Sequence, residues 1–170
     1  MIPMMRNLFL TLAVALFAMV SCGTQNKLPP GGVASLTSAE SGNDQFAIYK
    51  VRDDDDNPAY ILAANHTLVS FNYSTLDVSG GFGFGDGKAL FLGENFEDAM
   101  ESLDELIALF EMPDGTQKEY PCWEEESVTI VLHRGILGRS LSIGDASLSR
   151  GELKSLRYNF KSSRKVHENL

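Results

Sequence analysis

The side chains that could support nucleophilic catalysis in this chain are one cysteine in a charged segment and two histidines elsewhere in the sequence. Cys122 lies in the segment YPCWEEE and would need a base such as His66 or His133 to accept its proton. The glutamates that follow disfavour a thiolate at this position. We therefore expect Cys122 to be a small apolar residue at the start of a strand, with a small cysteine hydrolase kept as an alternative function.

Clustered carboxylates at residues 53–56, followed by Asn57, raise the question of a calcium site, because hard cations bind oxygen ligands. In the register of an EF-hand loop, Pro58 replaces the required glycine and Ala64 replaces the bidentate glutamate. The glycine-rich segment 80–93 contains a Gly-Lys pair, but Ala89 follows it where a phosphate-binding loop has serine or threonine. The sequence therefore predicts no cofactor, no metal centre and a solvated turn at 53–57, with a looser calcium site there left open.

Charge is distributed unevenly along the chain. Residues 53–126 contain 18 acidic residues and 2 lysines, whereas residues 127–170 contain 3 acidic and 8 basic residues. In the helix expected at 95–111, the acidic side chains lie opposite the apolar face, and like charges four positions apart repel each other. This acidic face is either solvated or binds a cationic partner; its candidate residues are Glu97, Glu101, Asp104 and Glu105.

Basic residues near the C-terminus recur at spacings of four and three, which would align them in one stripe on a helix. The candidate residues of this stripe are Arg150, Lys154, Arg157 and Lys161, and Arg164 continues it. The stripe could neutralise the acidic part of the same domain or remain solvated. The alternatives are docking to anionic lipid headgroups or to a charged protein partner.

The overall composition is typical of a soluble globular domain. The chain has 170 residues, of which 44% are apolar and 22% are charged, and its net charge is −9. A net negative charge disfavours nucleic acid as a partner.

The N-terminal segment predicts export from the cytosol. Thirteen mostly apolar residues at 8–20 are too few to cross a bilayer as a helix, but are typical of a signal peptide. The sequence Met19-Val20-Ser21-Cys22 that follows resembles the lipobox of bacterial lipoproteins. The resemblance implies cleavage before Cys22 and acylation of this cysteine, and Gly23 after it favours the outer membrane. An ordinary secretory signal or N-terminal anchor is the alternative.

The sequence predicts three segments, of which only the last is folded. Residues 1–21 are expected to be a signal peptide, and residues 22–45 a lipidated cysteine with a flexible linker rich in Gly, Ser and Pro. Residues 46–170 have the usual length of a single domain. Acylation of Cys22 would leave Cys122 as the only thiol, so the stability of this domain must come from burial.

Residue patterns within the domain predict an α+β fold with a mostly antiparallel sheet and helices on one face. The clearest element is an amphipathic helix at about 95–111, with Asn95 as its cap. Ser149 and Glu152 fit a capping box for a second helix, although 150–161 also alternates as a strand would, and we favour the helix. Strands are expected at 46–51, 59–64, 67–73, 88–92, 127–133 and 139–143, with a loosely held strand or hairpin at 80–87.

Together these features predict a lipid-anchored protein of the bacterial cell envelope, facing the periplasm or the cell surface. Its domain is expected to be a non-catalytic binding or adaptor module for another envelope protein. The first alternative is an inhibitor or immunity-type lipoprotein that binds a cationic envelope enzyme or toxin through the acidic face. The second is the cysteine hydrolase considered above.

Overall fold

The computed structural model describes residues 33–42, 44–52, 55–65, 88–123, 127–136 and 138–170. The expected signal peptide, Cys22, the strand predicted at 67–73 and the hairpin predicted at 80–87 lie outside these residues. The structure therefore bears on the folded domain and on the last part of the segment expected to be a linker.

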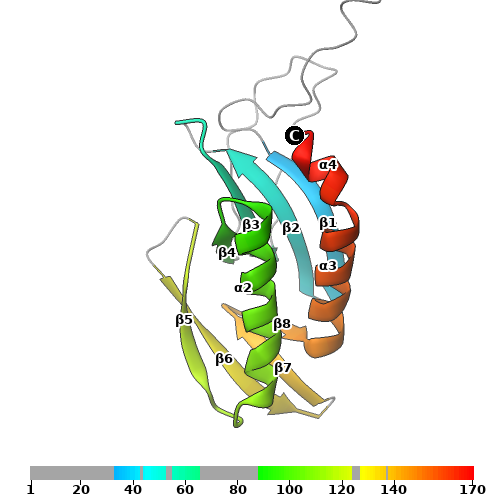
Figure 1. The fold of residues 1–170 in the computed structure, drawn as a ribbon. Coiled ribbons are helices and arrows are strands. Elements are labelled where there is room, and N and C mark those ends of the chain that lie inside the picture. The colour runs from blue at the N-terminus through cyan, green and yellow to red at the C-terminus, as the bar shows by residue number, and fades with distance from the viewer. Residues whose placement is uncertain (1–32, 43, 53–54, 66–87, 124–126, 137) are drawn as a thin grey trace, which may run out of the picture.

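Two four-stranded antiparallel sheets and two main helices form the described part of the chain, which confirms the predicted α+β class (Figure 1). The first sheet contains β1 (Val33–Ser41), β2 (Asp44–Arg52), β3 (Pro58–Ala64) and β4 (Lys88–Gly93), in that order. The second contains β5 (Gln117–Pro121), β6 (Ser127–Gly135), β7 (Gly138–Ile143) and β8 (Ala146–Ser149). The helical segments are α2 (Phe96–Ala108), the 3₁₀ turn η1 (Leu109–Glu111), α3 (Arg150–Ser162) and the short α4 (Arg164–Glu168).

The prediction of a linker over residues 22–45 is wrong for its last part, because β1 occupies residues 33–41. This strand pairs with β2 in an antiparallel ladder that extends from Val33–Val51 to Ser41–Asp44. The sequence pattern did not indicate this strand, because β1 consists mainly of small and polar residues with little apolar alternation. Leu36 and Ala39 nevertheless pack against the core, and backbone pairing with β2 supplies the rest of the stabilisation.

Both helices begin where the sequence predicts. The side-chain oxygen of Asn95 accepts a hydrogen bond of 2.9 Å from the backbone N–H of Asp98, which caps α2. Ser149 and Glu152 form the reciprocal capping box at the start of α3. Helix rather than strand therefore prevails at 150–161, because this cap and a buried stripe with helical spacing act together.

The main hydrophobic core joins the two sheets and the two helices. Figure 1 shows α2 and α3 side by side on the same side of the sheets, and the two helices contact each other. Buried and exposed side chains alternate along β6, as in a half-buried sheet, whereas β2 and β3 are buried on both faces. The second face of the first sheet carries a smaller apolar cluster, which Phe91 and Trp123 flank. The largest fully buried side chains are Phe46, Phe160, Ile48, Ile61, Leu62, Leu90, Leu92, Leu103, Leu106, Ile130, Leu132 and Leu141.

A close approach of backbone at the end of β4 explains why glycine occupies position 93. Gly93 has a φ of +146°, and a Cβ placed there would lie 2.5 Å from the Cβ of Asp98 in the first turn of α2. The side chain of Ser102 also donates a 2.7 Å hydrogen bond to the carbonyl of Leu92. The start of α2 is thus held tightly against the end of β4.

Candidate functional site

The acidic and basic residues singled out in the sequence mostly bind each other. Arg157 makes a bidentate ion pair with Asp104, at 2.5 and 2.6 Å, between α3 and α2. Arg164 binds Glu97 at 2.8 Å, and Arg150 binds Glu111. Intramolecular neutralisation, one of the alternatives for the basic stripe, therefore accounts for its arginines.

These three ion pairs form a regular ladder, which we name the arginine ladder. Its acids are seven residues apart at 97, 104 and 111, and its arginines are seven apart at 150, 157 and 164. Seven residues are close to two helical turns, so the acids lie along one side of α2 and η1, and the arginines along one side of α3 and α4. The two helices run in opposite directions, and every pair in the ladder therefore matches.

The lysines of the basic stripe do not take part in the arginine ladder. The side chains of Lys154 and Lys161 are exposed and make no hydrogen bond or ion pair with another described residue. Tyr158 lies between them on the same helix with 69% of its surface exposed. The predicted stripe thus divides into arginines that bind α2 and lysines that contact solvent, as the stronger bidentate geometry of arginine favours.

The acidic face predicted on α2 is likewise divided. Glu97 and Asp104 belong to the ladder, and Glu105 binds Lys118 of β5 at 2.7 Å. The side chain of Glu101 is exposed and makes no hydrogen bond or ion pair with another described residue, so it is the member of the predicted set that remains available to a partner. The surface open to a cationic enzyme is therefore narrower than the four residues suggest.

The coupling between Asp104 and Arg157 is expected to be about 0.5–1 kcal/mol, because the pair is bidentate but only partly buried. A double-mutant cycle with Asp104→Ala and Arg157→Ala, measured by urea unfolding, gives this value directly. The matched control is the cycle with Glu101→Ala and Lys154→Ala, for which we expect no coupling. Equal coupling in the two cycles would contradict the ladder.

A cleft of 340 Å³ opens where β4 and β5 separate, under the flank of α2. On the α2 side of the cleft, the Glu105 carboxylate accepts hydrogen bonds from Lys118 Nζ at 2.7 Å and from the Tyr120 hydroxyl at 3.2 Å. The hydrogen bond from Lys118 holds the pKa of Glu105 below its usual range, and burial raises the pKa of Tyr120. Glu105 is therefore a charged, fixed carboxylate in this cleft.

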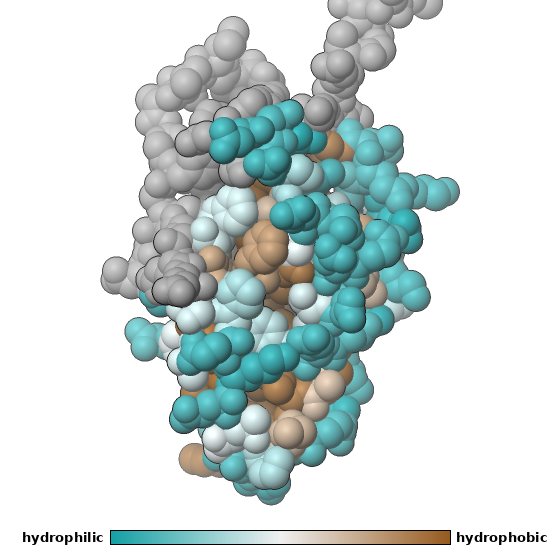
Figure 2. All heavy atoms as spheres, turned by 60° about the vertical axis from the view of Figure 1, so that its left-hand side comes forward, coloured by the Kyte–Doolittle hydropathy of each residue, from teal (hydrophilic) through white to brown (hydrophobic). Residues whose placement is uncertain are grey.

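Figure 2 shows this flank of the molecule, where hydrophobic surface lies open between hydrophilic side chains. The residues that line the cleft come from β4, β5 and α2: Phe91, Leu92, Gly93, Asp98, Ser102, Glu105, Lys118, Glu119, Tyr120 and Pro121. Apolar walls with a few polar groups are typical of binding sites. Sequence reasoning missed this cleft because β5 is short and mostly exposed, and its residues have no apolar period.

His133 lies on the outer face of the second sheet. Its ring nitrogens are 2.9 Å from the hydroxyl of Ser140 and 3.1 Å from that of Ser142, both on the neighbouring strand β7. The histidine borders a second, wider cleft of 710 Å³ between the β1–β2 turn and the β6–β7 hairpin. Two serine hydroxyls therefore occupy both ring nitrogens of this histidine.

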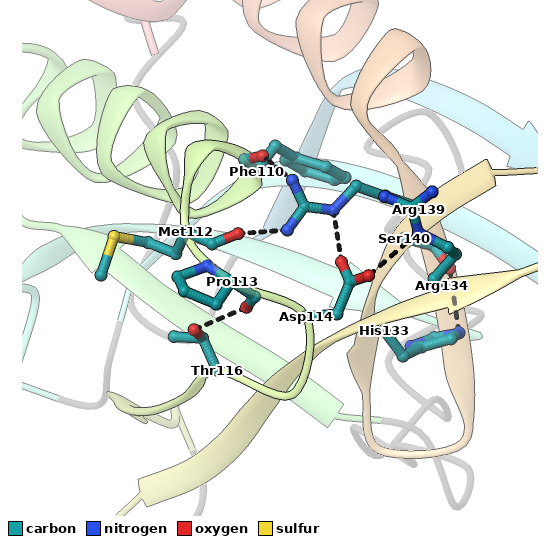
Figure 3. A network of polar contacts seen from close by, with 9 residues as sticks. All are labelled: Phe110, Met112, Pro113, Asp114, Thr116, His133, Arg134, Arg139 and Ser140. Carbon is teal, nitrogen blue, oxygen red and sulfur yellow. Dashed lines mark hydrogen bonds and ion pairs between the residues drawn. The ribbon is translucent and has the colours of Figure 1, made fainter.

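Arg139 holds the β6–β7 hairpin against the segment after α2 (Figure 3). Its guanidinium donates to the carbonyl of Phe110 at 2.5 Å and to that of Met112, and it pairs with Asp114 at 2.6 Å. Arg134 binds the other oxygen of Asp114 at 2.9 Å. The hydrogen bond from Arg134, together with the charge of Arg139, lowers the pKa of Asp114. These contacts fix the hairpin, and they leave Ile136 at its tip fully exposed.

Cys122 is half-buried and packs against the core directly after β5, where it forms an isolated bridge with Leu90 of β4. Within the described residues it makes no hydrogen bond to a histidine, and His66 lies outside them. The structure places Cys122 just past a strand end rather than at the strand start that the sequence predicts. Its surroundings resemble those of a structural cysteine.

The acidic turn after β2 is described only in part. Asp56 has a φ of +67° and binds Arg52 at 2.8 Å, and residues 53 and 54 lie outside the described residues. Across the described ranges, no three His, Cys, Asp or Glu side chains lie close enough together to hold a metal ion.

Comparison with known protein families, curated proteins and solved structures finds no match for this chain. Among the helices described by the structure, none has the length and apolar character needed to cross a membrane.

Proposed function

We propose that this protein is a lipid-anchored protein of the bacterial cell envelope, attached through Cys22, and that its α+β domain binds another envelope protein. The observation that carries the anchor is the apolar segment at 8–20 followed by Met19-Val20-Ser21-Cys22. Gly23 supports the outer membrane over the inner one. Two or more acyl chains on one cysteine would hold the protein stably at the bilayer surface.

The β4–β5 cleft and the exposed carboxylate beside it support a binding role for the domain. The β4–β5 cleft combines apolar walls with fixed charged groups, and Glu101 leaves negative charge open beside it. The alternative of a cysteine hydrolase gains no support, because Cys122 packs against the core and His133 is bound to serines. The alternative of an inhibitor that binds a cationic enzyme depends on fewer acids than the sequence suggested, since three of the four are paired within the domain.

Replacing Cys22 with alanine is expected to abolish lipid attachment. Cells fed an alkyne analogue of palmitate should label the wild-type protein and not the Cys22→Ala variant, which should also leave the membrane fraction or remain unprocessed. Cys122→Ala is the matched control and should be labelled like the wild type. Equal labelling of wild type and Cys22→Ala, or no labelling of either, would refute the anchor.

A further inference from the structure

The outer edge of β5 is the most open sheet edge in the described structure. At the far end of the same sheet, Asp44 accepts a 2.8 Å hydrogen bond from the backbone N–H of Ser147 in β8. In the first sheet, β1 packs against α3, and Ser102 of α2 binds the carbonyl of Leu92 in β4. In β5, by contrast, four of five residues are exposed.

Backbone alternation shows which groups of β5 point into the cleft. Just before β5, the carbonyl of Thr116 accepts a hydrogen bond from the N–H of Leu132, so residue 116 faces β6. In a strand, residues two apart point the same way, and Lys118 and Tyr120 therefore also direct their backbone groups to β6. The N–H and C=O of Gln117 and Glu119 therefore point away from β6, and outside the β5–β6 ladder no backbone hydrogen bond joins either residue to another described residue.

Pro121 explains why β4 does not pair with the outer edge of β5. Along β4 and β5, the two sheets pair at the Leu90–Cys122 bridge, next to which the N–H of Trp123 donates to the carbonyl of Ala89 at 2.8 Å. For the ladder to continue along β5, residue 121 would have to donate its N–H to β4, and proline has none. The strands separate from this point, and the cleft lies between them.

The charge around the cleft favours a cationic occupant. Its acidic lining residues are Asp98, Glu105 and Glu119, and its only lining cation among the described residues is Lys118. Glu101 adds exposed negative charge on the adjoining face of α2. A second copy of this chain, with a net charge of −9, is disfavoured by repulsion.

We propose that an extended, cationic segment of a partner protein adds to β5 as a further strand in the β4–β5 cleft. The backbone of Glu119 would donate to and accept from this segment, while alternate apolar side chains would contact Phe91 on one face. Lysine or arginine side chains on the other face would lie near the acidic lining. This inference rests on the proposed binding role and is independent of the lipid anchor.

The test uses the full chain and a blocked hexapeptide of alternating lysine and valine. Binding should slow the hydrogen exchange of the Glu119 and Gln117 amides, and should leave the amides of the β7–β8 ladder unchanged. A peptide with N-methyl groups on alternate amides should bind at least about tenfold more weakly, because it loses the backbone pairing. A peptide with glutamate in place of lysine should lose a similar factor.

Protein variants separate backbone pairing from charge. Glu119→Pro removes the N–H of the edge and should weaken binding at least about tenfold, whereas Glu119→Gln keeps it and should weaken binding no more than about threefold. The native proline at position 121 shows that the edge of β5 accepts proline. Circular dichroism of the Glu119→Pro variant checks that the domain remains folded.

Three results would overturn strand addition: no protection of Glu119 at about 1 mM peptide, equal binding of the N-methylated peptide, or equal binding of the glutamate peptide. Failure of the anchor would appear separately, as loss of Cys22 labelling with peptide binding intact.

Discussion

Replacement of Phe160 with alanine is expected to lower the free energy of unfolding by about 3–5 kcal/mol, the cost of removing a large buried aromatic side chain. Phe160 is fully buried between α3 and the first sheet. Its ring stacks on Phe96 at 5.1 Å, meets Tyr60 edge-on at 5.4 Å and lies 4.5 Å from the ring of His167. Truncation therefore leaves a cavity where β3, the start of α2 and α4 meet.

Tyr158, two residues earlier on the same helix, provides the matched control because it is mostly exposed. Its replacement by alanine should change the free energy of unfolding by no more than about 0.5 kcal/mol. Urea unfolding of both variants, followed by circular dichroism, makes the comparison. Similar losses for the two variants would show that α3 is not anchored through Phe160.

Acidification is expected to destabilise the domain through His167, which is fully buried in α4. Ser163 lies 2.8 Å from Nε2 of this histidine, whereas Nδ1 has no hydrogen-bond partner among the described residues. Burial, and secondly the charge of Lys50, lower the pKa of His167 to about 4. The neutral ring is therefore the form that fits the folded protein.

The direction of the effect follows from the lowered pKa. In the unfolded chain the histidine protonates near its ordinary pKa of about 6.5, whereas the folded protein resists protonation until pH falls to about 4. The stabilisation is fully present above pH 6.5 and is lost between that value and about pH 4. This difference between the pKa of His167 in the unfolded and folded states corresponds to a loss of about 3 kcal/mol in the free energy of unfolding.

The variant His167→Phe isolates this contribution because phenylalanine does not titrate and suits a site lined by Phe160, Phe96 and Tyr60. The free energy of unfolding of both proteins should be measured from pH 7 to pH 4. Carboxylates titrate in both, so their contribution cancels in the difference. We expect the wild type to lose about 3 kcal/mol more than the variant. Parallel curves would show that His167 is not held neutral.

The helices and most strands of this fold could be predicted because their signals are local. The cap at Asn95, the box at Ser149 and the apolar stripes of both helices lie within a few residues of each other. The strands β1, β5 and β8 could not be predicted in this way. β1 is rich in small polar residues, β5 is mostly charged or exposed and β8 has four residues, so their pairing partners determine them.

The candidate site was predicted only in part, since charge alone does not reveal a partner within the same domain. The acids of α2 and the bases of α3 were recognised, and a shared spacing of seven was the signal that could have paired them. The β4–β5 cleft has no local signal, because it depends on Pro121 meeting the backbone of β4 across the fold.

The arginine ladder has a consequence for how the two helices choose their alignment. Each rung is partly exposed and contributes little free energy by itself. A slip of one turn between the α2–η1 segment and the α3–α4 segment would nevertheless break all three ion pairs at once, and their penalties would add. Three weak ion pairs at a common spacing of seven residues therefore together favour one alignment of the two helical segments and disfavour alignments shifted by one turn.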